Sequence, residues 1–78
     1  MKYELKPVDG RKSFYGKAVV EISSDGTETL YSYQTPVMRR KGSELTRLWS
    51  GYSATTGRHV AAFCGIKKAD WDKMEVRR

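Results

Sequence analysis

Apolar and polar residues alternate with a period of two over much of the first half of the chain, which predicts β-strands. One such run extends from Phe14 to Ile22 and a second from Thr27 to Val37. The tripeptide Ser-Asp-Gly at residues 24–26 separates them and is typical of a hairpin turn. The sequence therefore predicts an antiparallel hairpin here.

Two further stretches extend this pattern. Lys41-Gly42 is a second turn signal, and the alternating residues that follow it predict another strand, with Met38 near Leu45 and Arg39 near Glu44.

Tyr3 and Leu5 also alternate near the N-terminus, which indicates a short edge strand there. Pro7 limits that strand, because proline cannot donate a ladder hydrogen bond. Pro36 is expected near a strand end or at a bulge for the same reason.

The length of the first hairpin loop determines which residues share a face. A two-residue turn at Asp25-Gly26 pairs Val20 with Tyr31 and Ala18 with Tyr33, whereas a three-residue loop pairs Val20 with Leu30 and Ala18 with Ser32. A slip of one residue moves the whole apolar set of a strand to the other face. We favour the two-residue turn, because it gathers apolar and aromatic residues on one side.

A helix is expected from Ala54 to Cys64. Ser53 is a suitable N-cap and Gly65 is suited to a left-handed C-terminal residue. At 100° per residue, Val60 and Phe63 face the core.

On the same helical wheel Arg58 faces water and His59 lies at the margin. Gly57 would be explained by a close approach of the helix to the sheet. A short second helix over residues 67–74 would place Trp71 and Met74 on one side.

These elements predict a single α+β domain spanning residues 1–78: an antiparallel meander of three or four strands with one helix packed across one face and a short C-terminal helix. The face beneath the helix is expected to contain Phe14, Ala18, Val20, Ile22, Tyr31, Tyr33, Val37 and Leu48. The opposite face is expected to contain Tyr15, Lys17, Val19, Leu30, Met38, Leu45, Arg47 and Trp49.

Composition narrows the classes of function. The 78 residues are 38% hydrophobic and 31% charged, as in a globular protein. The longest apolar run, Val60 to Cys64, is far shorter than the roughly 18 residues of a membrane helix. Lys2, Glu4 and Lys6 interrupt the apolar stretch that a secretory signal would need. We therefore expect a cytoplasmic protein that does not span a membrane.

The sequence offers little for catalysis or metal binding. One Cys and one His form neither a disulfide nor a zinc set. His59 and Cys64 lie about 140° apart around a helix, so they do not form a nucleophile pair. Paired carboxylates and phosphate loops are missing from the sequence as well. We expect a non-enzymatic protein without a cofactor or a metal.

The positive charge is concentrated in one segment. Residues 29–69 contain seven Lys and Arg residues against Glu44 alone, so this segment accounts for the whole net charge of +6. Such a field favours a polyanion or an acidic protein surface as partner.

The predicted outer face mixes aromatic and basic residues. Bases stack on aromatic rings while Lys and Arg neutralise phosphates, which suits single-stranded nucleic acid or a nucleoprotein complex. The candidate binding residues are Tyr15, Lys17, Arg39, Arg40, Lys41, Arg47, Trp49 and Arg58. Two alternatives are that the C-terminal helix covers this face or that a second copy does, as in a homodimer.

The start of the main helix is a weaker candidate. The hydroxyls of Ser53, Thr55 and Thr56, together with free backbone N–H groups, could bind an anion. The simpler interpretation is that Ser53 only caps the helix.

Three blocks of sequence resemble a family of small uncharacterised proteins of bacterial phages, plasmids and integrated elements. The blocks are Tyr31 to Val37, residues 48–56 (LWSGYSATT) and Arg58-His59, and the resemblance covers roughly residues 14–76. It implies a mobile-element setting without supplying an activity.

A second hypothesis follows from this setting, the small size and the lack of catalytic groups. The protein would inhibit a host defence nuclease, such as a CRISPR effector, by protein–protein binding. Trp49, Met38 and Leu45 would be the anchor residues of its protein interface. Arg39 and Arg40 would contact an acidic or nucleic-acid-binding surface of the target.

Overall fold

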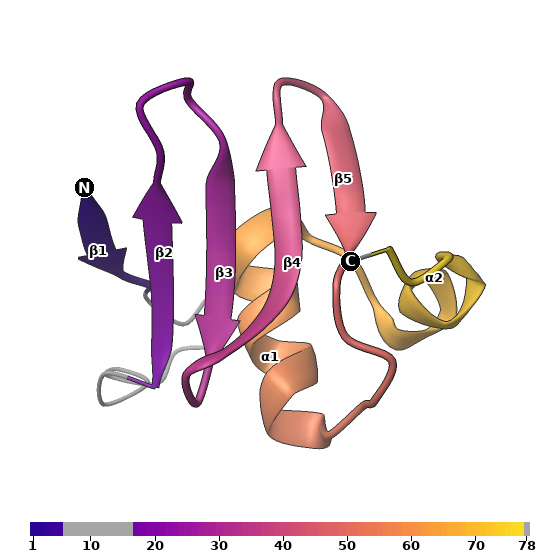
Figure 1. Cartoon of the computed structure of the whole chain (residues 1–78). Coiled ribbons are helices and arrows are strands. Elements are labelled where there is room, and N and C mark those ends of the chain that lie inside the picture. The colour runs from indigo at the N-terminus through magenta and orange to yellow at the C-terminus, as the bar shows by residue number, and fades with distance from the viewer. Residues whose placement is uncertain (6–16, 78) are drawn as a thin grey trace.

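The structure is a computed structural model that describes residues 1–5 and 17–77. In these residues five strands form one antiparallel sheet, and spatial neighbours are also neighbours in the chain. The strands are β1 (Lys2–Glu4), β2 (Ala18–Ile22), β3 (Glu28–Ser32), β4 (Thr35–Lys41) and β5 (Glu44–Arg47). The helices are α1 (Ala54–Cys64) and α2 (Lys68–Lys73). In Figure 1, α1 lies behind the sheet and α2 lies beside β5.

The α+β class and the antiparallel meander are confirmed, but the described residues form five strands rather than three or four. The additional strands have two sources. The N-terminal edge strand is present as β1, and the single strand expected from Thr27 to Val37 is divided into β3 and β4. Phe14, expected beneath the helix, lies outside the described residues.

The register of the first hairpin is the alternative that we did not favour. Val20 pairs with Leu30 and Ala18 pairs with Ser32. Ser23 N–H donates to the carbonyl of Thr27 at 2.9 Å, which leaves a three-residue loop between them. Gly26 ends this loop with φ of +87°, the left-handed residue that a three-residue hairpin requires.

This register exchanges the faces of β3 relative to the prediction. Leu30 and Ser32 are buried beneath α1. Tyr31, predicted to lie there, instead projects from the opposite face, and Tyr33 is 50% exposed.

A two-residue turn, Tyr33-Gln34, separates β3 from β4. Ser32 pairs with Thr35 across it, and the φ angles of Tyr33 and Gln34 are +52° and +72°. This is the left-handed geometry of the tight hairpin turn in which Asn and Gly are usual. Each non-glycine residue in such a conformation costs about 1–3 kcal/mol, so sequence pattern alone would not predict a turn here.

A β-bulge next to this turn sets the face of β4. Leu30 pairs with Met38 and Tyr31 pairs with Pro36, so Val37 is the additional residue. Both Val37 and Met38 are buried as a result. The expectation that Pro36 lies near a strand end or a bulge is confirmed.

The last hairpin also differs from the prediction. Met38 pairs with Arg47 and Arg40 pairs with Leu45, two residues away from the predicted register. Met38 is fully buried, and Leu45 is partly buried against the core. The placement of Met38, Leu45 and Arg47 on the outer face is therefore wrong.

The boundaries of α1 agree with the sequence. The Ser53 side chain accepts a hydrogen bond from Thr56 N–H, and Gly65 follows the helix in the left-handed conformation. A Cβ at Gly57 would lie 2.6 Å from the hydroxyl oxygen of Tyr52. The close approach at Gly57 is therefore to the Tyr52 side chain of the preceding loop rather than to the sheet.

Arg47 links the sheet to the C-terminal segment through its side chain. Its side chain is on the inner side, and the residue is only 7% exposed. Nε donates to the carbonyl of Trp49 at 2.8 Å, Nη1 to that of Trp71 at 2.7 Å and Nη2 to that of Ser50 at 2.9 Å. The guanidinium also stacks 4.3 Å above the centre of the Trp71 ring. One side chain thus satisfies carbonyls in the loop after β5 and in α2.

Candidate functional site

The face of the sheet directed away from α1, here called the outer face, is not covered by any described helix or strand (Figure 1). The pairing aligns its residues in rows across the strands. One row is Lys2, Glu21, Thr29, Arg39 and Thr46, and the next is Glu4, Val19, Tyr31 and Pro36. Lys41 and Glu44 form a third row.

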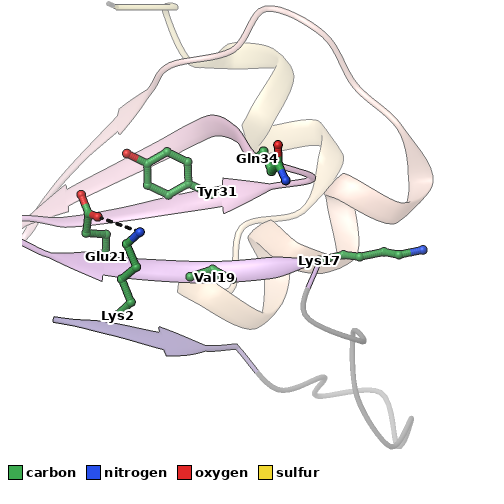
Figure 2. A pocket seen from close by; sticks show the side chains of 6 residues that line it. All are labelled: Lys2, Lys17, Val19, Glu21, Tyr31 and Gln34. Atoms are coloured by element: carbon green, nitrogen blue, oxygen red, sulfur yellow. Dashed lines mark ion pairs between the residues drawn. The ribbon is translucent and has the colours of Figure 1, made fainter.

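The first hollow on the outer face has Tyr31 among its lining residues and a volume of about 340 Å³. Figure 2 shows its six lining residues: Lys2, Lys17, Val19, Glu21, Tyr31 and Gln34. Lys2 Nζ lies 3.6 Å from a carboxylate oxygen of Glu21 and offsets its charge. Lys17 extends from the end of β2 toward solvent, and its ammonium group lies 5.4 Å from the centre of the Tyr33 ring. The Tyr31 ring and two lysine side chains thus line one hollow, with the Lys2 ammonium group directed at Glu21 and that of Lys17 at Tyr33.

A second hollow lies beside β4 and has Trp49 in its lining. Thr35, Pro36, Arg39, Leu48 and Trp49 line it. Trp49 is half-buried and also packs against the core, so only part of its surface is available to a ligand. Arg39 also lines a third, more polar hollow, with Lys41 and Glu44. Arg39 therefore connects an aromatic site to a charged one.

Four of the predicted binding residues are brought together around the outer face. They are Lys17, Arg39, Lys41 and Trp49. Lys41 Nζ also lies 3.5 Å from a carboxylate oxygen of Asp25, in an exposed pair of the kind that contributes little to stability. Tyr15 lies outside the described residues.

The remaining arginines are directed elsewhere. Arg40 faces α1, where its guanidinium donates to Glu28 and to the carbonyl of Phe63. The hydrogen bond to Glu28 raises the pKa of Arg40. Arg47 is buried among backbone carbonyls, and Arg58 belongs to α1 on the other side of the sheet. These three residues therefore do not form one surface with Arg39.

Sequence reasoning missed Tyr31, Lys2 and Gln34. Tyr31 was assigned to the core because the two-residue loop was favoured; the three-residue alternative places it outside. Gln34 was not recognisable, since its position depends on the left-handed turn.

At the start of α1 the hydroxyls of Ser53 and Thr56 already have partners. Ser53 accepts from Thr56 N–H at 3.1 Å, and Thr56 Oγ1 lies 3.0 Å from Ser32 Oγ in the interior. Thr55 is only partly exposed. This geometry is that of a capped helix packed on β3, and it leaves little of the proposed set for an anion.

His59 is fully buried rather than at the helix margin. Its Nδ1 lies 2.8 Å from Ser32 Oγ, and its ring centre is 5.8 Å from that of Tyr33. Burial lowers the pKa of His59, and the positive charge of Arg58 lowers it further. A neutral buried imidazole between a hydroxyl and a ring is a packing group here.

The lowered pKa predicts how stability depends on pH. Unfolding restores the ordinary pKa of His59 near 6.5. As the pH falls through that value, the unfolded state binds more protons than the folded state does. The free energy of unfolding is therefore retained above the ordinary pKa of His59, and it decreases as the pH falls from there toward the lower pKa of the folded state. We expect the urea midpoint to decrease between about pH 7.5 and about pH 5.5.

His59→Gln is the matched variant for this measurement. It lacks the titrating group, so its urea midpoint should change less over the same pH interval. An equal decrease in both proteins would assign the pH dependence to other groups.

The described residues contain no group of three or more His, Cys, Asp or Glu side chains placed to hold a metal ion. Within the same part of the chain, no helix is long and apolar enough to cross a membrane.

The fold and the outer face define a small α+β protein with a meander sheet, one face of which is packed by α1 while the other lies open in the described residues. The chain belongs to a family of unknown function, DUF8033, which matches residues 3–76. Comparisons with curated proteins and with solved structures gave no match.

Proposed function

We propose that this protein is a non-enzymatic module that binds single-stranded nucleic acid on the outer face of its sheet. One observation carries the proposal: two hollows on the same face each combine an aromatic ring with basic side chains. Tyr31 has Lys2 and Lys17 beside it, and Trp49 has Arg39 beside it. Stacking of bases on rings contributes about 1–3 kcal/mol per base, and nearby cations neutralise the phosphates.

The arrangement favours a single strand over a duplex. Rings in an open sheet face can stack only on bases whose own faces are free. The cations lie along the face rather than in one cluster: Lys17 at one end of β2, Arg39 in the middle of β4 and Lys41 at its end. A flexible strand can follow such a path across the sheet.

The alternative function, a protein inhibitor of a host defence system, has less support, because two of its three proposed anchor residues are not available on the outer face. Met38 is fully buried and Leu45 packs against the core, so of the three anchors only Trp49 lies at a hollow of the outer face. The mobile-element setting and the cytoplasmic location stay predictions from sequence.

Binding to single-stranded oligonucleotides of about ten nucleotides tests the proposal, with salt as the variable. For single strands, each phosphate contact contributes about 0.7 to the slope of log affinity against log salt. Three contacts, from Lys17, Arg39 and Lys41, predict a slope near −2. Fluorescence anisotropy at several salt concentrations measures it.

Arg39→Gln and Arg58→Gln form a matched pair, since each removes one exposed charge from opposite sides of the molecule. Arg39→Gln should weaken binding and reduce the slope by about 0.7, while Arg58→Gln should leave the slope unchanged. Absence of binding at low salt, or an equal effect of both substitutions, would refute the proposal. Measurement of the mass in solution in the same buffer would show whether a second copy occupies the face instead.

A further inference from the structure

The first and second hollows of the outer face adjoin each other across one strand boundary. Tyr31 lines the first hollow and Pro36 lines the second. These two residues are paired on β3 and β4, which lie side by side in the sheet (Figure 1). Neighbouring strands are about 5 Å apart, so a single step across the sheet leads from the lining of one hollow to that of the other.

The apolar residues that line the two hollows form a path across the strands, here called the apolar track. Val19 on β2 pairs with Tyr31 on β3, and Tyr31 pairs with Pro36 on β4. The second hollow joins Pro36 to Leu48 and Trp49, which follow β5. The track therefore runs from β2 to the loop after β5, across the strands rather than along any one of them.

A polar row lies alongside the apolar track on the same face. Its members are Lys2, Glu21, Thr29, Arg39 and Thr46, which lie two or three residues farther along each strand, or about 7–10 Å away. The Lys2 ammonium group offsets the charge of Glu21, whereas Arg39 is exposed and also lines the second hollow. The track thus suits the faces of bases, and Arg39 suits a phosphate beside them.

The spacing of the hollows determines how two bases can lie on the track. In a stacked strand, successive nucleotides are about 3.4 Å apart. The residues that line the two hollows are separated by at least one strand spacing, about 5 Å, so bases held in both hollows are not stacked on each other. Each base instead stacks on a protein group, as unstacked bases do in the recognition of single strands.

We infer that the apolar track holds two consecutive nucleotides of a single strand, with one base against Tyr31, the next against Trp49, and the step between them over the Tyr31–Pro36 pair. This inference rests on the proposed function and goes beyond it, because it fixes the course of the strand across β3 and β4 and the number of bases that stack on rings.

The test uses single-stranded DNA probes of about ten nucleotides in which every base is missing except at chosen central positions. The backbone and its charges are then the same in all probes, so only the bases differ. Three probes carry one thymine, two adjacent thymines, or two thymines separated by one abasic nucleotide. The wild-type protein should bind the probe with two adjacent thymines about fivefold more tightly than the probe with one, or better, a difference of about 1 kcal/mol. Separated thymines should bind less tightly than adjacent ones.

Tyr31→Ala and Tyr31→Phe are the matched variants for this measurement. Tyr31→Ala leaves one ring on the track, so the second thymine should add no more than the statistical factor of having two thymines. Tyr31→Phe keeps a ring in the first hollow and should retain the advantage of adjacent thymines. A thermal melt of each variant checks that it is folded.

Trp49 packs against the core, so its part is measured without a substitution. Stacking of a base on an indole quenches its fluorescence, and the other tryptophan, Trp71, is buried. At saturation, the probe with two adjacent thymines should quench the fluorescence of the wild-type protein more strongly than the probe with one, because a single thymine divides its time between the two hollows.

The results separate this inference from the function on which it rests. Wild-type protein that binds no oligothymidine at low salt would overturn both. If oligothymidine binds but two adjacent thymines have no advantage over one, the inference alone fails. It also fails if separated thymines bind more tightly than adjacent ones, if Tyr31→Ala retains the advantage, or if the second thymine causes no further quenching.

Discussion

Arg47→Ala is expected to destabilise the protein by at least about 3 kcal/mol, because it removes a charged donor from several buried or partly buried backbone carbonyls. The substitution leaves the carbonyls of Trp49, Ser50 and Trp71 without the donor that now lies within 3 Å of each. It also removes the group that stacks on the Trp71 ring. Hydrogen bonds to charged groups contribute about 1.5–3 kcal/mol each, which supports an effect of this size.

Thermal denaturation followed by circular dichroism measures this effect. In a domain of this length, 1 kcal/mol shifts the melting temperature by about 4–8 °C, so a decrease of at least about 12 °C is expected. Arg47→Lys should give an intermediate loss, because one ammonium group cannot reach carbonyls that a planar guanidinium spans. Arg39→Ala, an exposed arginine on the opposite face, should change stability by no more than about 0.5 kcal/mol.

The contrast between Arg47 and Arg39 also tests the assignment of faces. If Arg47→Ala melted like the wild type and instead lost binding to nucleic acid, Arg47 would project from the outer face. The description of β5 would then be wrong.

Leu30→Ala should be the second most damaging of these substitutions, with a loss of about 2–5 kcal/mol. Leu30 is fully buried in the central strand, between Val20 on β2 and Met38 on β4. Replacing the isobutyl side chain with a methyl group leaves a cavity where strands on both sides limit collapse. Urea unfolding monitored by tryptophan fluorescence would measure the change.

Tyr31→Ala is the matched control, because it truncates the next residue along the same strand. Tyr31 is on the outer face, so the substitution should reduce oligonucleotide affinity by about 1–3 kcal/mol and lower stability less than Leu30→Ala does. If Tyr31→Ala lost more stability than Leu30→Ala, the two-residue loop would be the correct one and Tyr31 would lie in the core.

Local signals predicted the helix correctly. Ser53 and Gly65 mark its ends through hydrogen bonds and backbone geometry within a few residues, and the predicted boundaries, Ala54 and Cys64, are those observed. Val60 and Phe63 are buried as the helical period indicates. The position of His59 was missed, because the helical wheel does not include Ser32 and Tyr33 of the adjoining strand and turn.

The candidate site was predicted only in part. Lys17, Arg39, Lys41 and Trp49 were predicted to be binding residues from their charge and aromatic character; the structure places them around one face, and their role in binding stays a prediction. Arg40 and Arg47 have the same chemistry but point to the interior, where carbonyls and Glu28 occupy them. Residue type alone does not separate an arginine on the open face of the sheet from one that supports the fold.

What the sequence by itself determined is the α+β class, the antiparallel meander, the main helix with its caps and the position of the first hairpin. Each depends on contacts between residues close in the chain or on the period of the pattern. The tertiary structure decided the faces of β3, β4 and β5, and with them the site. Both faces of β3 carry large side chains, so periodicity did not choose between Leu30 and Tyr31. The choice came from the loop at Gly26 and the left-handed turn at Tyr33-Gln34, which set a register that buries Leu30 and leaves Tyr31 on the outer face.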